Sequence, residues 1–493
     1  MTTEWNKSEA TLIYERSQPG RVGAQLEAPR LSDTERAALI PERFRRAEPP
    51  ALPEVTEGEL MRHYVDLASK NFHIDKGFYP LGSCTMKYNP KRNDAAAAHP
   101  GFAESHPLAP DSVSQGSLRL MWELEEILKE ITGFDAVTLQ PVAGAHGELV
   151  GALVMKAYHD HTGAPRHKML IPDSAHGTNP ASVVMSGLTP VEVKSNDRGL
   201  MSVEAVRAAL DDDTVGIMLT NPNTLGLFES EILGIVEAVR EAGALLYMDG
   251  ANLNAQLGIV KPGKIGFDLL HMNLHKTFST PHGGGGPGAG ALGVSSRLEP
   301  FLPAPTLARR TAGADGPEFY LDYDRPLSIG RVHSCYGNFA NSVRAYAYIR
   351  TLGERGLRRV SENAIINANY LRVLLRDTYQ VAFPGHCQHE VVLSAERQKK
   401  AGGRAGDISK RLLDYGFHSP TTYFPLIVRE ALMIEPTETE SRQTLEEFAA
   451  VMKRISREIE ESPELVTSAP HSTPVRRLNE AKAARELDVC YTG

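Results

Sequence analysis

Short apolar runs and helical patterns alternate along the middle of the chain. Apolar residues that recur every three or four positions predict helices, whereas short apolar runs bounded by polar turns are typical of strands buried on both faces. The helical patterns lie at Leu118–Ile131, Gly147–Tyr158, Ser202–Leu210 and Glu229–Ala242. The runs that predict strands are Lys168–Ile171, Val191–Val193, Val215–Thr220, Ala244–Met248, Leu269–Leu274 and Ala289–Val294.

This alternation predicts an α/β fold with a mostly parallel sheet covered by helices on both faces. Crossovers between parallel strands are right-handed in nearly all known sheets, which limits the possible topologies. Ligands of such sheets bind beyond the carboxyl ends of the strands. Residues that directly follow the predicted strands are therefore the first place to look for chemistry.

The two ends of the chain differ from its middle. The first hundred or so residues are rich in Pro and charge and hold only short periodic pieces such as Glu57–Ser69, which predicts an arm that lies on other surfaces. From near Asn341, helical patterns and the runs Val391–Leu393 and Ala431–Ile434 predict a smaller α+β domain. We expect an arm and interface segment at 1–115, a large α/β domain at 116–340, a small α+β domain at 341–460 and a polar tail at 461–493.

Composition narrows the class of protein. The chain of 493 residues is 41% hydrophobic and 23% charged, with a formal net charge of -8 and no long basic run, so neither nucleic acid nor a membrane is an expected partner. Its 4 cysteines are widely spaced and fit a reducing compartment rather than a disulfide framework. The N-terminal segment has neither an apolar signal stretch nor the acid-poor composition of a transit peptide. We therefore expect a cytoplasmic protein.

Lys276 is the first candidate for chemistry. It follows the predicted strand Leu269–Leu274 and precedes a glycine-rich turn, so it lies at the carboxyl end of a strand. A lysine that acts as a Schiff-base nucleophile needs a partly neutral amine, which burial and nearby cations provide by lowering its pKa. A single lysine after a strand is more often a solvated loop residue, so the chemical role depends on its neighbours.

The glycines after Lys276 allow a second interpretation. Gly283, Gly285 and Gly288 match the GxGxxG fingerprint of dinucleotide-binding folds. That fingerprint leaves a strand and opens a helix, whereas this run leads into the predicted strand Ala289–Val294. We therefore expect no nicotinamide site, and the glycines favour a backbone that passes close to a ligand or a neighbouring chain.

Asp249 follows the apolar run Ala244–Met248. Enzymes that use pyridoxal phosphate (PLP) place an anion opposite the pyridine nitrogen, because a protonated ring is the electron sink that stabilises a carbanion. One strand and one crossover separate Asp249 from Lys276, so both side chains can reach one site. The plainer alternative is an aspartate that caps a helix, and the pairing with Lys276 favours the cofactor role.

Three further strand ends carry small or polar residues. Backbone N–H groups at a helix N-terminus bind phosphate well, and a histidine or hydroxyl at a strand end can contact a cofactor. Each signal is weak alone, because many loops of α/β proteins have this composition, and their convergence on one sheet edge is the stronger indication. The residues are Gly144, Ala145 and His146 at the helix Gly147–Tyr158, His176 after Lys168–Ile171, and Asn223 and Thr224 after Val215–Thr220.

A zinc site is the competing interpretation of the histidines and cysteines. His386, Cys387 and His389 are closely spaced, with His333 and Cys335 elsewhere in the chain. Their alternation with polar and apolar residues predicts a strand, which would place His386 on the face opposite Cys387 and His389. Only part of the set could then share a metal, so we expect structural histidines and no metal.

Several phrases of the sequence resemble the P-protein of the glycine cleavage system, in the form that has a separate PLP-bearing second subunit. They span most of the chain in order, and the phrase around Lys276 and PLGSCTMK are highly specific. One departure is a loop with Ala143 and His146 where many relatives have Asn or Ser and Gln, so the individual phosphate contacts stay open. The phrases are KNFHIDKGFYPLGSCTMKYNP, QPVAGAHGE, PDSAHGTNPAS, MDGANLNA, HMNLHKTFSTPHGGGGPG, GRVHSCYGNF and MIEPTETES.

The resemblance implies a PLP-dependent transferase fold of type I, similar to aspartate aminotransferase, with a seven-stranded type of sheet in the large domain. It also implies roles for single residues. These are Lys276 as the Schiff-base lysine, Asp249 as the partner of the pyridinium nitrogen, His176 as the residue stacked on the ring, Gly144, Ala145, His146, Thr224, Asn252 and His275 as cofactor contacts, and Ser83, Cys84 and Thr85 at the substrate entrance.

The implied reaction is an oxidoreductase step in which glycine is decarboxylated with PLP and its aminomethyl group passes to the lipoyl arm of the H-protein. The implied partners are a homologous first subunit, in a heterotetramer, and indirectly the T- and L-proteins. Another type I PLP enzyme, such as a desulfurase, would share Lys276 and Asp249 without requiring PLGSCTMK. A non-catalytic scaffold subunit would lack the Schiff-base lysine, so Lys276 in its full phrase favours the catalytic chain.

Overall fold

The computed structural model describes residues 11–24, 27, 30–282, 288–312 and 316–490. Their contacts divide the chain into two compact units, Met1–Lys76 with Pro470–Gly493, and Gly77–Ala469. Each unit is considered by itself, and the finer division expected from the sequence stays a prediction.

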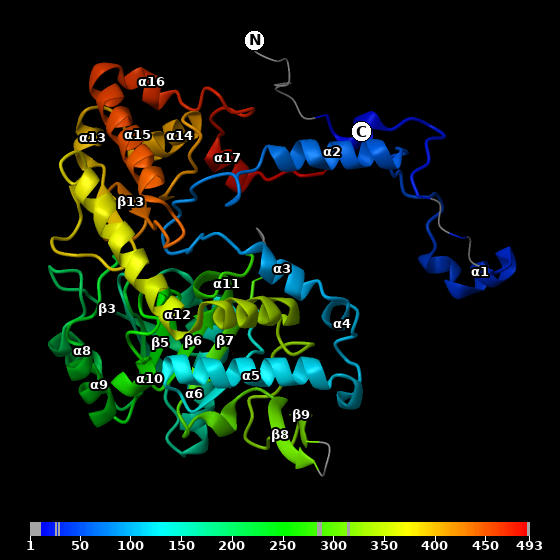
Figure 1. Ribbon diagram of the computed structural model, residues 1–493, viewed down its shortest axis with the longest axis horizontal. Coiled ribbons are helices and arrows are strands. Elements are labelled where there is room, and N and C mark those ends of the chain that lie inside the picture. Colours follow the sequence, from blue (N-terminus) through cyan, green and yellow to red (C-terminus); the bar gives the residue numbers. More distant parts are fainter. Residues whose placement is uncertain (1–10, 25–26, 28–29, 283–287, 313–315, 491–493) are drawn as a thin grey trace. The chain divides into compact units, whose positions relative to one another are not determined.

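A seven-stranded sheet forms the centre of the larger unit (Figure 1). Its strand order is β1-β7-β6-β5-β4-β2-β3, in which β6, β5, β4, β2 and β3 run parallel and β7 is antiparallel to both of its neighbours. The predicted α/β class with a mostly parallel sheet is therefore confirmed. The strands are β1 (Ala136–Thr138), β2 (Lys168–Pro172), β3 (Thr189–Val193), β4 (Thr214–Thr220), β5 (Leu245–Gly250), β6 (Leu269–Asn273) and β7 (Gly290–Val294).

The two faces of this sheet bury alternate side chains of each strand, as the period of a strand requires. On β5, Leu246 and Met248 belong to one hydrophobic cluster, whereas Leu245 and Tyr247 belong to another. Helices therefore cover both faces. Those of the first cluster are α5 (Gln115–Thr132), α8 (Val203–Ala209), α9 (Ile232–Glu241) and the first part of α12 (Phe339–Leu375), and those of the second are α6 (Gly144–His161) and α7 (Thr178–Met185).

A smaller antiparallel sheet with the order β10-β11-β13-β12 follows in the chain. Its core is shared with the last part of α12, which changes direction at Gly353, where φ is 60° and ψ is -175°. The strands are β10 (Gln380–Val381), β11 (Val391–Ser394), β12 (Thr421–Thr422) and β13 (Ala431–Ile434), with the helices α13 (Glu396–Lys400), α14 (Ala405–Asp414), α15 (Arg442–Glu461) and α16 (Pro463–Thr467).

Short elements complete the larger unit. Before α5, the chain packs Ala97 against Val343 of α12, so this stretch belongs to the body of the unit. The remaining elements are α3 (Lys91–Ala97), α4 (Pro100–Ala103), α10 (Pro262–Ile265), α11 (Leu274–Thr277), the hairpin β8 (Thr306–Ala312) and β9 (Gly316–Asp322), and the 3-10 turns Asp111–Val113, Leu253–Ala255 and Glu299–Phe301.

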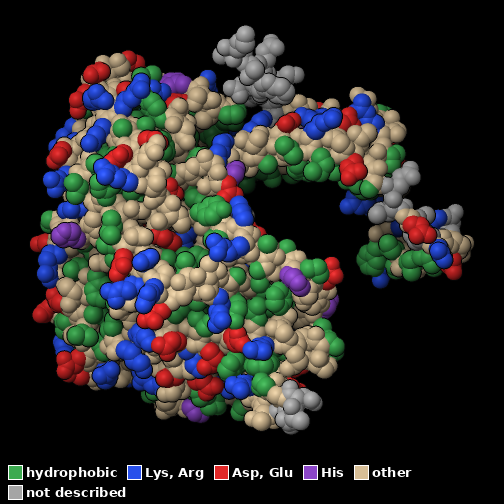
Figure 2. Space-filling model, viewed as in Figure 1, with side chains coloured by type: hydrophobic (Ala, Val, Ile, Leu, Met, Phe, Trp, Pro, Cys, Tyr) green, Lys and Arg blue, Asp and Glu red, His purple; other side chains and the backbone are tan. Residues whose placement is uncertain are grey.

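The smaller unit contains α1 (Asp33–Leu39), α2 (Glu57–Ser69) and α17 (Glu480–Arg485), with 3-10 turns at Ile13–Arg16 and Glu42–Phe44. A capping box fixes the start of α2, where Thr56 accepts the N–H of Glu59 and Glu59 accepts the N–H of Thr56. One side of α2 exposes apolar side chains, visible as a green band in Figure 2. They are Leu60, Met61, Tyr64, Val65 and Leu67. No helix in the described part of the chain is long and apolar enough to span a membrane.

The strand predicted at His386–His389 is wrong. These residues lie in an irregular segment before β11, because the amide of Asn369 takes the place of a strand partner. Asn369 Nδ2 donates to the carbonyl of Cys387 at 2.6 Å, and the N–H of Cys387 donates to Asn369 Oδ1 at 3.2 Å. Cys387 and His389 are nevertheless buried and His386 is exposed.

The GxGxxG match does not open a helix. Gly288 leads into β7, while Gly283 and Gly285 lie outside the described residues. A dinucleotide fingerprint requires a helix at this point, so the structure gives no support to a nicotinamide site here.

Glu125 on α5 links the protonation of a buried carboxyl group to stability. Tyr336 Oη donates to Glu125 Oε1 at 2.6 Å, and burial raises the pKa of Glu125 to about 8. The unfolded chain ionises this group near its ordinary pKa, so the protein loses stability as the pH rises from about 5 to about 8, at up to ~1.4 kcal/mol per pH unit. Glu125→Gln keeps an acceptor for Tyr336 and should remove the contribution of this group, so the variant should lose less stability over that pH range than the parent protein. Thermal unfolding midpoints of both proteins across that pH range measure this difference. An equal decline in both proteins would show that Glu125 does not cause the loss.

Candidate active site

The carboxyl ends of β5 and β6 bring Asp249 and Lys276 to one edge of the sheet. Asp249 pairs with Thr220 on β4 and with His271 on β6. Lys276 lies in α11, the single helical turn that directly follows β6. Two side chains expected at strand ends from the sequence therefore lie at neighbouring ends of parallel strands.

Asp249 is a fully buried carboxylate that is held by several donors. Its Oδ2 accepts from His176 Nε2 at 2.9 Å, Thr220 Oγ1 at 3.1 Å and Asn179 Nδ2 at 3.2 Å. Its Oδ1 accepts the backbone N–H of Ala251 at 2.9 Å. These donors come from three different strand ends, so the order of the sheet builds the site.

Two histidines keep Asp249 ionised. His271 Nε2 lies 3.3 Å from Asp249 Oδ1, and its Nδ1 lies 2.8 Å from Tyr247 Oη. Burial alone would raise the pKa of Asp249, but His271 and His176 hold it well below its ordinary value. Burial opposes the charging of His176 as well, yet Asp249 raises the pKa of His176 above its ordinary value.

Glu148 on α6 is a second carboxyl group beside His176. Its Oε1 lies 3.7 Å from His176 Nε2 and accepts from Thr178 Oγ1 at 3.1 Å. Burial, and then repulsion from Asp249, raises the pKa of Glu148. Asp249 is therefore the carboxyl group of this pair that ionises first as the pH rises.

Lys276 is held by the segment PLGSCTMK. Its Nζ donates to the backbone carbonyl of Ser83 at 2.8 Å. Ser83 and Thr85 have φ values of 60° and 48°, which residues other than glycine rarely adopt. Burial raises the pKa of the Cys84 thiol, and the nearby Lys276 opposes this shift. The structure thus brings the three predicted entrance residues directly beside the Lys276 amine.

Lys87, in the same segment, is a buried cation that sequence analysis missed. Its Nζ donates to Glu438 Oε1 at 2.9 Å, Asn254 Oδ1 at 2.9 Å and the carbonyl of Thr277 at 2.8 Å. Because Thr277 follows Lys276, these bonds fix the turn that carries Lys276. Its only signal in the sequence is its place in a specific phrase.

The first turn of α6 contains the residues predicted to bind phosphate. The helix begins at Gly144, earlier than the predicted start, and no side chain caps it at Ala143. Gly144 packs so closely on β6 that a Cβ there would lie 2.3 Å from Asn273 Nδ2. His146 Nδ1 accepts the N–H of Val142 at 3.2 Å. With Ala145 exposed beside them, the first N–H groups of this 18-residue helix are suited to an anion.

Thr224, Asn252 and His275 already have protein partners. Thr224 and Asn252 each donate to a backbone carbonyl of a neighbouring loop. His275 Nδ1 lies 2.9 Å from the carbonyl of Ala289, and burial, reinforced by Lys276, lowers the pKa of His275 to about 4. These three side chains shape the loops around the site.

Several buried polar atoms around Asp249 and Lys276 have no hydrogen-bond partner among the described residues. Such atoms are rare in folded proteins and indicate bound water or a polar ligand. Together with one amine, one buried anion and an uncapped helix start, they fit a phosphorylated aromatic aldehyde such as PLP. The atoms are Asn179 Oδ1, Asn252 Oδ1, Asn273 Oδ1, Thr277 Oγ1, Thr280 Oγ1 and His282 Nε2.

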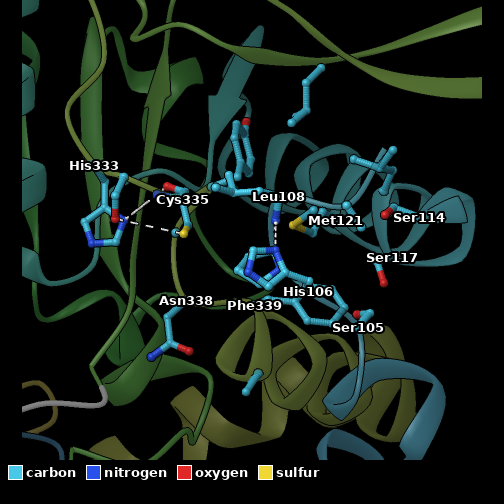
Figure 3. A pocket seen from close by; sticks show the side chains of 18 of the residues that line it. Ser105, His106, Leu108, Ser114, Ser117, Met121, His333, Cys335, Asn338 and Phe339 are labelled. Carbon is cyan, nitrogen blue, oxygen red and sulfur yellow. Dashed lines mark hydrogen bonds between the residues drawn. The ribbon is translucent and has the colours of Figure 1, made fainter. Parts of the chain in front are cut away.

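An open cavity of about 750 Å³ lies beside α5 (Figure 3). Val142 and Gly288 line it, from the loops before α6 and β7, and Asn338 Nδ2 donates to the carbonyl of Gly288 at 3.2 Å. Asp249 and Lys276 do not line it. The cavity is therefore a neighbouring space that shares two loops with the site.

The residues of the zinc hypothesis do not come together as one set. Two groups of His and carboxylate side chains in the described parts of the chain have ligand atoms within 4.8 Å of one another. One is Glu148, His176 and Asp249, and the other is His389, Glu390 and Glu435. Neither contains a cysteine.

The fold matches solved structures of PLP-dependent enzymes. A glycine decarboxylase (P-protein) of the glycine cleavage system in inhibitor-bound form superposes with a TM-score of 0.74 at 21% identity, covering 86% of this chain and 95% of that one. A cysteine desulfurase from Thermococcus onnurineus has a TM-score of 0.61 at 15% identity, covering 78% and 95%. The chain therefore has the type I fold of PLP-dependent enzymes.

Sequence comparisons define the family. The family "Glycine cleavage system P-protein" matches residues 30–411, and "Glycine dehydrogenase, C-terminal domain" matches residues 360–475. Proteins described as "Probable glycine dehydrogenase (decarboxylating) subunit 2" are similar over nearly their whole length. The one from Chlorobium phaeobacteroides is 57% identical over 97% of this chain and 99% of its own, and the one from Caldanaerobacter subterraneus is 52% identical over 100% of both. The chain belongs to the glycine cleavage system P-protein family, in its separate second-subunit form.

The contact between Asp249 and His176 gives a test of the site's electrostatics. Asp249→Asn should lower the pKa of His176, on the order of one pH unit, because its main anionic neighbour is lost while the burial remains. The pH dependence of His176 modification by diethyl pyrocarbonate, followed by peptide mapping, measures this. The exposed His167 is the control and should react alike in both proteins. An unchanged midpoint for His176 would show that Asp249 does not control it.

Proposed function

We propose that this chain is the PLP-bearing subunit of a cytoplasmic glycine decarboxylase, which releases CO2 from glycine and passes the aminomethyl group to the lipoyl arm of an H-protein. Membership of the family supports this activity. The observation that carries the proposal is a buried anion, Asp249, beside an amine, Lys276, at adjacent strand ends. When bound, PLP supplies the electron sink on which decarboxylation of an amino acid depends.

Different residues of the site would bind different parts of PLP. Lys276 would bind it covalently through its amine, Asp249 would accept a hydrogen bond from the protonated ring nitrogen, and His176 would lie against the ring. The uncapped first turn of α6 would receive the phosphate. The further cofactor contacts in this proposal are Gly144, Ala145, His146, Thr224, Asn252 and His275.

Asp249 contributes by keeping a negative charge where water is excluded. A buried carboxylate stabilises a neighbouring positive charge far more strongly than an exposed one, because the local dielectric is low. His271 and His176 prevent Asp249 from taking up a proton itself. Its carboxylate is therefore available to hold a proton on a ring nitrogen at neutral pH.

The Ser83 carbonyl gives the free amine of Lys276 a defined resting position. This position would keep the Lys276 amine beside a substrate bound at the site. Cys84 and Thr85 stand next to this amine and would border the substrate entrance with Ser83. The open cavity beside α5 has a volume within the range of ligand sites, which supports access for a substrate that arrives on a carrier protein.

The relatives are described as second subunits, which implies that a first subunit is a partner. We propose a heterotetramer with two copies of each chain, since most oligomers are symmetric. The apolar side of α2, with Leu60, Met61, Tyr64 and Val65 exposed, supports a partner surface in the arm, because contiguous apolar patches mark contacts. The T- and L-proteins would act on the lipoyl group later.

The exchange of bicarbonate with the carboxyl group of glycine tests this function. We expect the chain alone to bind PLP and to exchange little, because a pocket completed by a second subunit stays open to water. Exchange should rise at least tenfold when the first subunit and lipoylated H-protein are added together. The assay is run on the chain alone, with each partner separately, and with both.

The matched control is H-protein without its lipoyl group. Full activity of the lone chain, or equal activity with unlipoylated H-protein, would defeat the proposal and favour a self-sufficient PLP decarboxylase.

A further inference from the structure

Two carboxyl groups meet at the edge of the small sheet that faces PLGSCTMK. Glu390 precedes β11 and Glu435 follows β13. Because Val391 pairs with Ile434 in an antiparallel register, both glutamates lie at the same edge of this sheet. Each is 0% exposed, and buried carboxyl groups are retained only where partners compensate their lost hydration.

The partners of both carboxyl groups lie in the turn that holds Lys276. Glu390 Oε2 accepts the N–H of Ser83 at 2.7 Å. Glu435 accepts the N–H of Thr85 at 2.7 Å and Thr85 Oγ1 at 2.6 Å. The carbonyl of Ser83 accepts from Lys276 Nζ at 2.8 Å. A continuous path of hydrogen bonds thus joins Glu390 to the amine of Lys276 through one residue.

The turn cannot be expected to hold this shape by itself. Ser83 and Thr85 are both in the left-handed region, which costs of order 1 kcal/mol or more for each residue without glycine's freedom. The turn is also pressed onto β13, since a Cβ on Gly82 would lie 2.2 Å from Met433 Cγ. The bonds to Glu390 and Glu435 supply the tertiary support that such a conformation requires.

The charge balance of this cluster includes Lys276. His389 Nε2 lies 3.9 Å from Glu390 Oε1 and 3.8 Å from Glu435 Oε1, but burial lowers the pKa of His389 to about 3, so its ring is neutral. Burial raises the pKa of Glu435 to about 7, while Lys276 and Lys87 oppose the shift. Burial and Glu435 raise the pKa of Glu390, which Lys276 also opposes. The amine and the two carboxyl groups are therefore coupled.

We propose that Glu390 and Glu435 are positioning residues for Lys276: through their hydrogen bonds they hold the Ser83–Thr85 turn in the shape that presents the Ser83 carbonyl to its amine. This inference rests on the proposed role of Lys276 as the cofactor-binding amine. The small sheet would thereby help to position Lys276, which follows a strand of the large sheet.

Other titratable groups also face Lys276, and the test has to separate them from the two glutamates. Histidines and a thiol surround the amine, but Glu390 and Glu435 are the carboxyl groups whose pKa it shifts. Among the residues that the structure describes, these groups are Cys84 in the turn, His176 after β2, His275 in α11, His282 after it, His389 before β11, and the two glutamates.

The test uses the full chain loaded with PLP and reads the pH midpoint of its visible absorbance, without any turnover. Glu390→Ala and Glu435→Ala should each lower this midpoint by about one pH unit or more, because the Ser83 carbonyl, which accepts from the protonated nitrogen, loses its fixed place. Glu435→Gln keeps an acceptor of the same length and should stay closer to the parent protein. Thr85→Val, which removes one hydrogen bond between the turn and Glu435 without changing shape, should shift the midpoint slightly in the same direction.

The matched control is Glu430→Ala. Glu430 precedes β13, is nearly buried, and accepts the N–H of Ala405 at 3.0 Å, so it supports the same sheet away from the turn. Its loss should not move the midpoint. Spectra of the Glu390→Ala and Glu435→Ala variants that match the control would overturn the inference, and if an alanine variant does not fold, an unshifted Thr85→Val decides against it. A parent protein that takes up no PLP would instead refute the proposed function.

Discussion

The larger unit depends on one buried carboxylate, that of Asp249. Among the residues that the structure describes, no lysine or arginine contacts it. Removing a carboxylate from water costs several kcal/mol in proteins, and hydrogen bonds from well-placed donors must offset that cost. For Asp249 these donors come from the ends of β2 and β4 and from the backbone N–H of Ala251, and His271 on β6 adds an electrostatic contact. The strand order, the crossovers and the helices on both faces are what bring them to one point. The site is therefore a direct product of the sheet's topology.

A second constraint joins the two sheets. The segment PLGSCTMK lies far from Lys276 in sequence, yet its Ser83 carbonyl accepts a hydrogen bond from the Lys276 amine. Lys87 of the same segment donates to the carbonyl of Thr277, which follows Lys276. The same segment donates to Glu390 and Glu435 at the edge of the small sheet. A shift of the small sheet would therefore move the turn whose carbonyl accepts from the Lys276 amine. This arrangement holds the Lys276 amine in one place between the two sheets.

Features that depend on residues close together in the sequence could be predicted, whereas features that depend on contacts between distant residues could not. Strand ends are local features of the hydrophobic pattern, so the α/β class and the places of Asp249 and Lys276 could be predicted. Glu390, Glu435 and Lys87 could not, because their burial arises from contacts with residues hundreds of positions away, and such residue types are ordinarily solvated. The strand expected at His386–His389 failed for a similar reason, since a side chain of α12 replaced the strand partner.

The proposed role of the Lys276 amine in binding the cofactor can be tested by borohydride reduction of the protein after incubation with PLP, followed by peptide mapping. We expect a pyridoxyl group on the peptide that contains Lys276 and no specific label in Lys276→Ala. Stable labelling of another lysine, or undiminished labelling of the variant, would contradict it.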